Sequence, residues 1–499
     1  MSKQGLLLSS VFMMLAVACM KSDDVYVGLL PRESFDKRDA FSLIAGDSFN
    51  SQDYSVTKEM VAEFILAEQG KKAYSIMPYP SEDRVLLYVV NFDEGWELFP
   101  GDSRFGLLLA KGGTGNMELS KISDNPGLCL WIEDYMNQIE NARNMEIVGD
   151  RASKSVRIWE LFRKLSTREN IIEDTSKLGG QGTRDMWAKI KLNSTISNDT
   201  LGYKAPLIQT KWGQQYPWNI NMPVVNNTDT CRTGCPAVAL AQILYYFHCQ
   251  QNMPTGMYDS INIATTSPYI CNNRTYYTIT VNRSSFTYNS TRWDNLPLSK
   301  DSGTLAGYSI VSELMLDIGA RLGLHYSPLD THIDVSSLNN YYYDTSPCNV
   351  SGTWEQYSYQ TTFGTVTNSL DLNIPVLVGG LSPNGNGGHT WIIDGYLHYV
   401  RAVTNRFEWW PVSMIPSGTA VFGYKDFYDL LAQYGTVYPG MQEIEYLPLE
   451  IELYSMNWGF DGVYDGDYVS IMPDDIQWKG LTSNVVVQHH LVASEFIAN

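Results

Sequence analysis

The sequence predicts an α+β protein built from two folded units, a small one followed by a larger, strand-rich one. The chain has 499 residues, more than a single hydrophobic core usually serves. Hydrophobic residues make up 44% and charged residues 18%, as in ordinary globular proteins. Helix and hairpin signals precede roughly residue 140, whereas many short apolar strands follow roughly residue 200. We therefore expect two units joined by a linker.

The first unit begins with signals for a helix and a β-hairpin. Val61, Phe64 and Ile65 recur at helical spacing after Thr57, whose hydroxyl can cap a helix. Residues 84–92 are typical of a strand, 93–95 of a turn and 96–99 of a second strand. A small α+β domain is expected.

Residues 146–200 are expected to form the linker. They mix charged helical segments with the polar, Gly-rich run 177–184. Because exposed segments of this kind are where proteolytic nicking concentrates, we expect cleavage between about residues 145 and 205. Residues 201–499 then form the second unit, in which apolar segments such as 374–378 and 485–487 predict strands.

The charge balance excludes some partners. The net charge is −19 and the pI is about 4.8, with no dense run of Lys and Arg. Neither nucleic acid phosphates nor anionic lipids are expected to attract such a chain.

The first 18 residues resemble a bacterial lipoprotein signal peptide. Lys3 precedes the apolar stretch 6–17, and Ala18 stands directly before Cys19. The apolar run is too short to span a bilayer comfortably, so a cleaved signal and lipidation of Cys19 are expected. Residues 21–24 resemble the acidic signal of some Bacteroidetes surface lipoproteins. We therefore expect an exported lipoprotein of the outer membrane or cell surface of a Gram-negative bacterium, with this lipid as its one link to a membrane.

The seven cysteines do not predict a metal site. Cys231 and Cys235 lie close together, but no second Cys or His pair follows at zinc-finger spacing. We expect neither a metal nor an organic cofactor. Disulfide bonds among Cys231, Cys249, Cys271 and Cys348 are an alternative that we leave undecided, because the sequence does not give their connectivity.

Cys235 is the candidate nucleophile. The residues after it are apolar on nearly every side and predict a buried helix, and Pro236 is tolerated in a first helical turn. Gly234 allows a tight turn into that helix. At a helix N-terminus the macrodipole favours a thiolate. A small buried cysteine without chemical function is the structural alternative.

His389 is the candidate base for this thiol. It follows Gly385, Gly387 and Gly388 and precedes the apolar run 391–393, so it stands at the start of a predicted buried strand. The other histidines lack this setting: His248, His325, His332, His398, His489 and His490.

Three further residues could complete the site. Asn457 and Trp458, after an apolar strand, could orient the imidazole. The backbone N–H of Cys235 and the side-chain amide of Gln214 could stabilise an oxyanion. Each of these residues also fits an ordinary core or loop position.

Taken together, these segments resemble the streptopain family of papain-superfamily cysteine peptidases. The resemblance rests on Thr233-Gly234-Cys235 with the helix after it, on Gly387-Gly388-His389, on 312–319, on Asn457-Trp458-Gly459 with Asp465-Gly466, and on the stretch around Gln214. It implies a papain-like, two-lobed catalytic domain with a helical lobe and an antiparallel β lobe. Gly388 and the loop 329–334, which includes His332, are then expected walls of the substrate site.

The first unit also resembles part of this family. Residues 89–96, 101–104 and 109–110, followed by Trp131 and Tyr135, are similar to its inhibitory propeptide. The resemblance implies a small α+β prodomain, expected over 25–145, that blocks the cleft until proteolysis removes it.

The chain departs from the family in three places. Pro236 replaces a small aliphatic residue beside the nucleophile. Phe460 and Asp461 stand where the family has Trp and Gly. An insertion over about 397–450, rich in aromatic residues, could cap the cleft or bind a partner.

We therefore expect a secreted or surface-attached cysteine endopeptidase, made as a zymogen and acting on proteins or peptides. A catalytically silent surface-binding protein on the same fold is the first alternative. Another acyl transferase with Cys–His machinery, such as a transglutaminase or an amidase, is the second.

Overall fold

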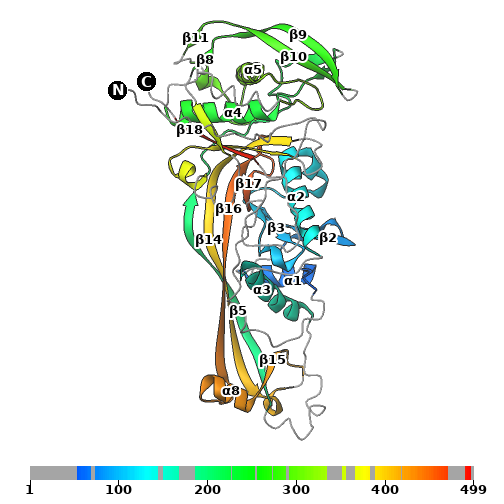
Figure 1. The fold of residues 1–499 in the computed structure, drawn as a ribbon, viewed down its shortest axis with the longest axis vertical. Coiled ribbons are helices and arrows are strands. Elements are labelled where there is room, and N and C mark those ends of the chain that lie inside the picture. Colours follow the sequence, from blue (N-terminus) through cyan, green and yellow to red (C-terminus); the bar gives the residue numbers. More distant parts are fainter. Residues whose placement is uncertain are drawn as a thin grey trace, which may run out of the picture.

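The computed structural model describes residues 53–68, 73–143, 150–167, 186–225, 227–252, 256–271, 274–287, 291–333, 351–355, 366–381, 388–416, 418–469 and 489–495. The molecule is elongated: helix α4 lies near one end, and helix α8 lies at the other end of a long sheet (Figure 1). Cys19 and the whole signal region lie outside the described residues.

The first unit has the predicted helix and hairpin. Helix α1 (Lys58–Ala67) starts after Thr57, whose side chain accepts a hydrogen bond from Met60 N as a cap. The strands β2 (Arg84–Asn91) and β3 (Trp96–Pro100) pair in antiparallel fashion. The unit is completed by β1 (Ser75–Ser81), β4 (Ala110–Gly112), the short helices η1 (Ser103–Phe105) and η2 (Leu119–Asp124), and the helices α2 (Pro126–Ala142) and α3 (Asp150–Thr167).

The second unit has two lobes, as predicted. The helical lobe has its own core between α4 (Cys235–Tyr245) and α5 (Leu305–Leu322). It also carries the hairpin β9 (Ile261–Cys271) and β10 (Arg274–Arg283). Its small elements are β6 (Val224–Val225), β7 (Asp229–Thr230), η5 (Tyr246–Gln250), β8 (Met257–Tyr258), β11 (Phe286–Thr287) and η6 (Trp293–Asn295).

The β lobe is part of one large antiparallel sheet. Its strands are β12 (Ser351–Glu355), β13 (Val376–Leu381), β14 (Gly388–Pro411), β16 (Met441–Asn457), β17 (Gly466–Val469) and β18 (His489–Glu495). The sheet order is β1-β2-β3-β4-β17-β16-β14-β13-β18-β12, so the first unit extends the sheet through the β4–β17 pair. Together with the helices this confirms the α+β class.

Strands β14 and β16 run far beyond the β lobe and form an arm with β5 (Met186–Lys204). We call residues 186–204 and 397–450 the arm. Its tip carries η7 (Val412–Met414), β15 (Val421–Asp426) and α8 (Phe427–Tyr434). The predicted insertion is thus a protruding sheet whose tip lies at the end of the molecule far from α4, so it does not cap the start of that helix (Figure 1).

The predicted linker 146–200 differs from the structure in two places. Helix α3 belongs to the first unit, because Trp159 and Phe162 are fully buried against Phe64. Strand β5 belongs to the second unit, because its residues 187–204 pair with β14. Residues 168–185, which include the Gly-rich run, lie outside the described residues.

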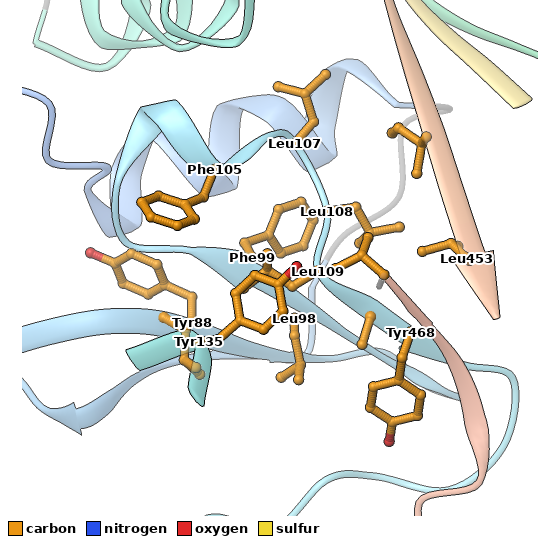
Figure 2. Packing of buried hydrophobic residues seen from close by; sticks show 14 of the residues in the cluster. Tyr88, Leu98, Phe99, Phe105, Leu107, Leu108, Leu109, Tyr135, Leu453 and Tyr468 are labelled. Carbon is orange, nitrogen blue, oxygen red and sulfur yellow. The ribbon is translucent and has the colours of Figure 1, made fainter. Parts of the chain in front are cut away.

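The first unit and the β lobe share one hydrophobic core. Leu453 of β16 and Tyr468 of β17 lie in the same cluster as Leu98, Leu108 and Leu109 of the first unit (Figure 2). Burial of large apolar side chains stabilises both units together. No helix among the described residues has the length and apolar character needed to cross a membrane. Cys231 and Cys249 carry free thiols, whereas Cys348 is outside the described part.

Candidate active site

The sulfur of Cys235 lies at the first turn of α4, between the two lobes. Gly234 turns the chain into the helix with φ +88°, and a Cβ at this position would lie 2.9 Å from Leu324 Cδ1. Only glycine fits both conditions. The backbone N–H of Thr390, on β14, donates to Cys235 Sγ at 3.4 Å. The helix N-terminus and this N–H both favour the thiolate form.

His389 reaches the same place from the β lobe. It is the second residue of β14, paired with Gly380 of β13, and it is buried. Its Nε2 lies 2.7 Å from the carbonyl oxygen of Trp458. Because a carbonyl only accepts, Nε2 carries a proton, and Nδ1 is the nitrogen left for Cys235.

The imidazole and the thiol influence each other. Burial lowers the pKa of His389, but the charge of Cys235, its hydrogen bond to the ring and the Trp458 carbonyl raise it, and the net direction is upward. An imidazole held in its charged form beside a thiol is the arrangement that activates a cysteine nucleophile. The structure therefore brings the two predicted residues together.

Trp458 is held by its own neighbours. Its backbone N–H donates to Asp465 Oδ1 at 3.0 Å, and its indole N–H donates to the Tyr464 carbonyl at 3.1 Å. Burial raises the pKa of Asp465 to about 7, although the Trp458 N–H lowers it. These bonds fix the carbonyl that orients His389.

Asn457 points elsewhere. Its Oδ1 accepts from Gln242 Nε2 at 3.0 Å and from Gly459 N at 3.1 Å, while its Nδ2 donates to the Thr210 carbonyl at 3.1 Å. Asn457 thus links the β lobe to α4 and to the segment before Gln214. Of the two predicted orienting residues, the structure places Trp458 against the imidazole.

Gln214 lies in a segment that pairs with the residues just before Cys235. Its backbone carbonyl accepts from Thr233 N at 3.1 Å, two residues before Cys235, and its side chain is buried. This pairing sets the Gln214 segment beside the start of α4. The prediction that its amide stabilises an oxyanion stays a prediction.

Asp461, one of the departures from the family pattern, supports the Gln214 segment. Its Oδ1 accepts from Trp218 Nε1 at 2.6 Å, and its backbone N–H donates to the Trp212 carbonyl at 3.2 Å. A Cβ on Gly213 would lie 2.5 Å from that same Oδ1, so the approach requires glycine there. The carboxylate therefore ties the turn after Trp458 to the residues on both sides of Gln214.

The two predicted substrate walls differ in position. Gly388 begins β14 directly before His389, which keeps it beside the site. His332 is buried in an aromatic cluster, with its Nε2 3.3 Å from Tyr269 Oη and its ring stacked on His325. His332 thus packs against neighbouring aromatic rings. Thr331 of the same loop lies next to the nucleophile segment, because its Oγ1 donates to the Arg232 carbonyl at 2.9 Å.

A cavity of about 710 Å³ lies beside the segment that leads into α4. Its walls include Gln215, Asn219, Arg232, Arg274 and Leu329. Cavities of this size accept side chains or small ligands, and the lining of this one includes neither Cys235 nor His389.

One group of described residues could hold a metal ion. His398, Glu450 and Glu452 have ligand atoms within 4.8 Å of one another, on β14 and β16 at the base of the arm. None of the contacts described above for Cys235 and His389 involves this group.

Helix α2 of the first unit sits directly on the imidazole. A Cβ on Gly127 would lie 2.5 Å from both His389 Cδ2 and Trp458 Cε3. Asn125 caps the helix by accepting from Leu128 N, and its Nδ2 donates to the Val463 carbonyl at 3.0 Å. His389 and Cys235 are 1% and 2% exposed, so no polypeptide reaches them in this form.

Several residues of the site carried no signal of their own. Thr390 acts through its backbone, and Gly127 lies in a different unit from the imidazole that it contacts. Gln242 could have been found, because it follows Cys235 by two helical turns and is a polar residue in an apolar helix.

Comparison with known families gives the class of this protein. Residues 212–409 match the model of the Peptidase C10 family, a range that includes Gln214, Cys235 and His389 and ends before Asn457. This region is therefore similar to the Peptidase C10 family, and the chain is a cysteine-type peptidase. The match confirms the resemblance to the streptopain family and, with the observed lobes, the predicted fold class.

Two solved structures from Prevotella intermedia are similar to this chain. A fragment of prointerpain A is 16% identical, with 85% of this chain and 99% of that chain covered and a TM-score of 0.48. The active wild-type interpain A cysteine protease is 20% identical, with 59% and 95% covered and a TM-score of 0.36. No curated protein matches the chain. The family match carries the assignment.

Proposed function

We propose that the chain is the zymogen of an exported cysteine endopeptidase. The observation that carries this proposal is the meeting of Cys235 and His389 across the two lobes, with the Thr390 N–H donating to the sulfur. A thiol at a helix N-terminus beside an imidazole of raised pKa has the properties of a nucleophile. The substrates are proteins or peptides.

The proposed reaction uses one imidazole nitrogen for every proton transfer. His389 Nδ1 takes the thiol proton, and the sulfur forms a bond to the carbonyl carbon of the scissile peptide. The oxyanion accepts hydrogen bonds from the Cys235 N–H and the Gln214 amide. The C–N bond breaks as His389 returns the proton to the leaving amine. Water, deprotonated by His389, then hydrolyses the thioester.

The first unit is the proposed inhibitory prodomain. In support, helix α2 contacts His389 and Trp458 through Gly127, and the site residues are buried beneath it. We place the activating cleavage in 168–185, because a cut there separates the whole first unit, including α3, from β5. Cuts inside α3 or β5 would have to break folded elements.

Export and lipid attachment at Cys19 belong to the same proposal and rest on the N-terminal signal. Labelling cells with a radioactive or clickable palmitate tests them. The wild type should incorporate the label, and Cys19→Ala should not. Equal labelling of both proteins would rule out Cys19 as the lipidated residue.

Release of new amino termini from casein tests the peptidase proposal. The matured wild type should produce them, and Cys235→Ala should not. Cys249→Ala is the matched control, because it removes another free thiol and should leave activity within about twofold of wild type. Casein cleavage by Cys235→Ala at the wild-type rate would contradict the proposal.

A further inference from the structure

The middle of the arm has one buried apolar face. Alternate residues of a strand share a face, and directly paired residues of neighbouring strands share it too. Tyr399, Arg401 and Val403 of β14 therefore lie on one face with their partners Ile451, Leu449 and Leu447 of β16. All six are buried. The opposite face is open to solvent in places, with Arg406, Ile444, Tyr446 and Glu450 exposed.

Helices α1 and α3 of the first unit cover this face (Figure 1). The arm residues share a continuous hydrophobic cluster with Phe64 of α1 and Phe162 of α3. The guanidinium of Arg401 lies 5.6 Å from the ring centre of Phe64. At the edge of the contact, Arg157 of α3 pairs with Glu445 of β16 at 2.9 Å.

A buried ion pair fixes the register of this contact. Arg401 Nη2 donates to Glu68 Oε1 at 2.8 Å, with the two side chains only 4% and 8% exposed. Asn198 of β5 accepts from Arg401 Nε at 3.1 Å and donates to Glu68 Oε1 at 3.3 Å. Removing one member of a buried pair leaves the other charge without compensation, so this pair favours the docked arrangement over separation.

The arm depends on this cover. Its tip has two small clusters of its own, around Val412 and around Leu430. The middle of the arm, in contrast, is a single layer of strands. A single sheet layer needs packing on one face to be stable, and an uncovered apolar face with an unpaired arginine is costly. None of the contacts described above involves residues 168–185, so cutting that segment does not break them.

We propose that the arm is a dedicated dock for the first unit and that residues 53–167 stay bound to it after the chain is cut within 168–185. Cutting then yields a non-covalent complex in which α2 still covers His389. Release of the cleft requires a second event that removes or degrades the first unit. The consequence for activity rests on the proposed function, but the binding itself does not.

The test uses the full chain with Cys235→Ala and a recognition sequence for a specific protease inserted between Thr175 and Ser176. After complete cutting, gel filtration and native mass spectrometry report whether the two pieces travel together. We expect one species with the mass of both pieces, still intact after dilution to nanomolar concentration. Two separate species under these conditions would overturn the proposal.

Two variants locate the dock. Glu68→Ala removes the buried partner of Arg401 and should weaken the cut complex at least tenfold. Arg157→Ala removes the edge pair, whose arginine is 61% exposed, and should change the dissociation constant less than threefold. If Glu68→Ala holds the pieces as tightly as Arg157→Ala does, the assignment of the dock to the Arg401 pair fails.

A second measurement separates this inference from the proposed function. It uses the chain with the inserted recognition sequence but with Cys235 retained, and it follows the labelling of Cys235 by an epoxide probe. Slow labelling of the cut complex, followed by at least tenfold faster labelling once the first unit is removed, supports both. Fast labelling of pieces that stay together would show that the dock holds but does not block the cleft. Slow labelling of fully separated pieces would refute the nucleophile instead.

Discussion

At the residue scale, the site depends on backbone groups as much as on side chains. The Thr390 N–H donates to the Cys235 sulfur, and the Trp458 carbonyl accepts from His389 Nε2. The side chain of Asn457 has a different task, because it joins Gln242 to the Thr210 segment. The imidazole is thus oriented by a main-chain carbonyl, and the neighbouring amide holds the two lobes in place.

Asn457→Ala should therefore lower stability more than it changes the chemistry. The variant leaves Gln242 Nε2 and the Thr210 carbonyl without partners, which costs about 1–3 kcal/mol for buried groups. Denaturant unfolding of the full chain measures this cost, and the pH profile of kcat/KM of the matured enzyme should keep its shape. The exposed Asn193→Ala is the control, with an expected change within about 0.5 kcal/mol. A shifted pH profile would mean that Asn457 acts on His389.

The buried carboxyl of Asp394 should make the protein less stable as pH rises. Burial raises the pKa of Asp394 to about 8, whereas the unfolded chain has its ordinary value near 4. The folded state binds more protons between these values, so stability falls across pH 4 to 8 and the loss is complete above that range.

Asp394→Asn tests this linkage. The amide oxygen can still accept from Ile208 N, but the group no longer titrates. Urea midpoints measured at pH 5 and pH 8 in a Cys235→Ala background should differ less in this variant than in its parent. Exposed Asp83→Asn should leave the difference unchanged. An unchanged difference in Asp394→Asn would argue against a protonated Asp394.

At the element scale, helix α2 is what makes the site inaccessible. Its first turn carries Gly127, which lets the backbone approach His389 and Trp458, and Asn125 anchors the same turn to Val463. The helix and the imidazole come from different units, and the contact between them joins the first unit to the active site.

Gly127→Ala should loosen this contact. The new methyl would lie 2.5 Å from two ring carbons, so α2 must shift, at a cost of about 1–3 kcal/mol. Cys235 in the uncut chain should then react with iodoacetamide several-fold faster, measured by mass spectrometry on full-length molecules alone. Gly113→Ala, where a Cβ meets nothing within 4 Å, is the matched control. Equal rates for the two variants would mean that α2 does not shield the thiol.

Local patterns predicted the elements that local physics determines. Helix α1 with its Thr57 cap, the β2–β3 hairpin and the start of α4 at Cys235 all follow from spacing, caps and turns. Strand β5 did not, because its exposed, polar face resembles a linker and its partners lie about 200 residues away in the chain. The approach of Gly127 to His389 has no local signal for the same reason.

At the scale of the whole molecule, one sheet runs through both units. Strand β4 of the first unit pairs with β17 of the second, and the arm continues the same sheet to the far end (Figure 1). The shared core around Leu453 and Tyr468 makes the first unit an integral part of the fold (Figure 2). The covering of His389 and the folding of the core are therefore coupled, because both depend on contacts between the first unit and the β lobe.

The rate at which iodoacetamide alkylates Cys235, measured against pH in the matured enzyme, tests the central claim most directly. An ordinary thiol becomes reactive only near its pKa of about 8.5. A thiolate paired with His389 should already react rapidly at about pH 5, and His389→Ala should lose at least tenfold of that rate. An ordinary thiol profile in the wild type, unchanged in His389→Ala, would contradict the account.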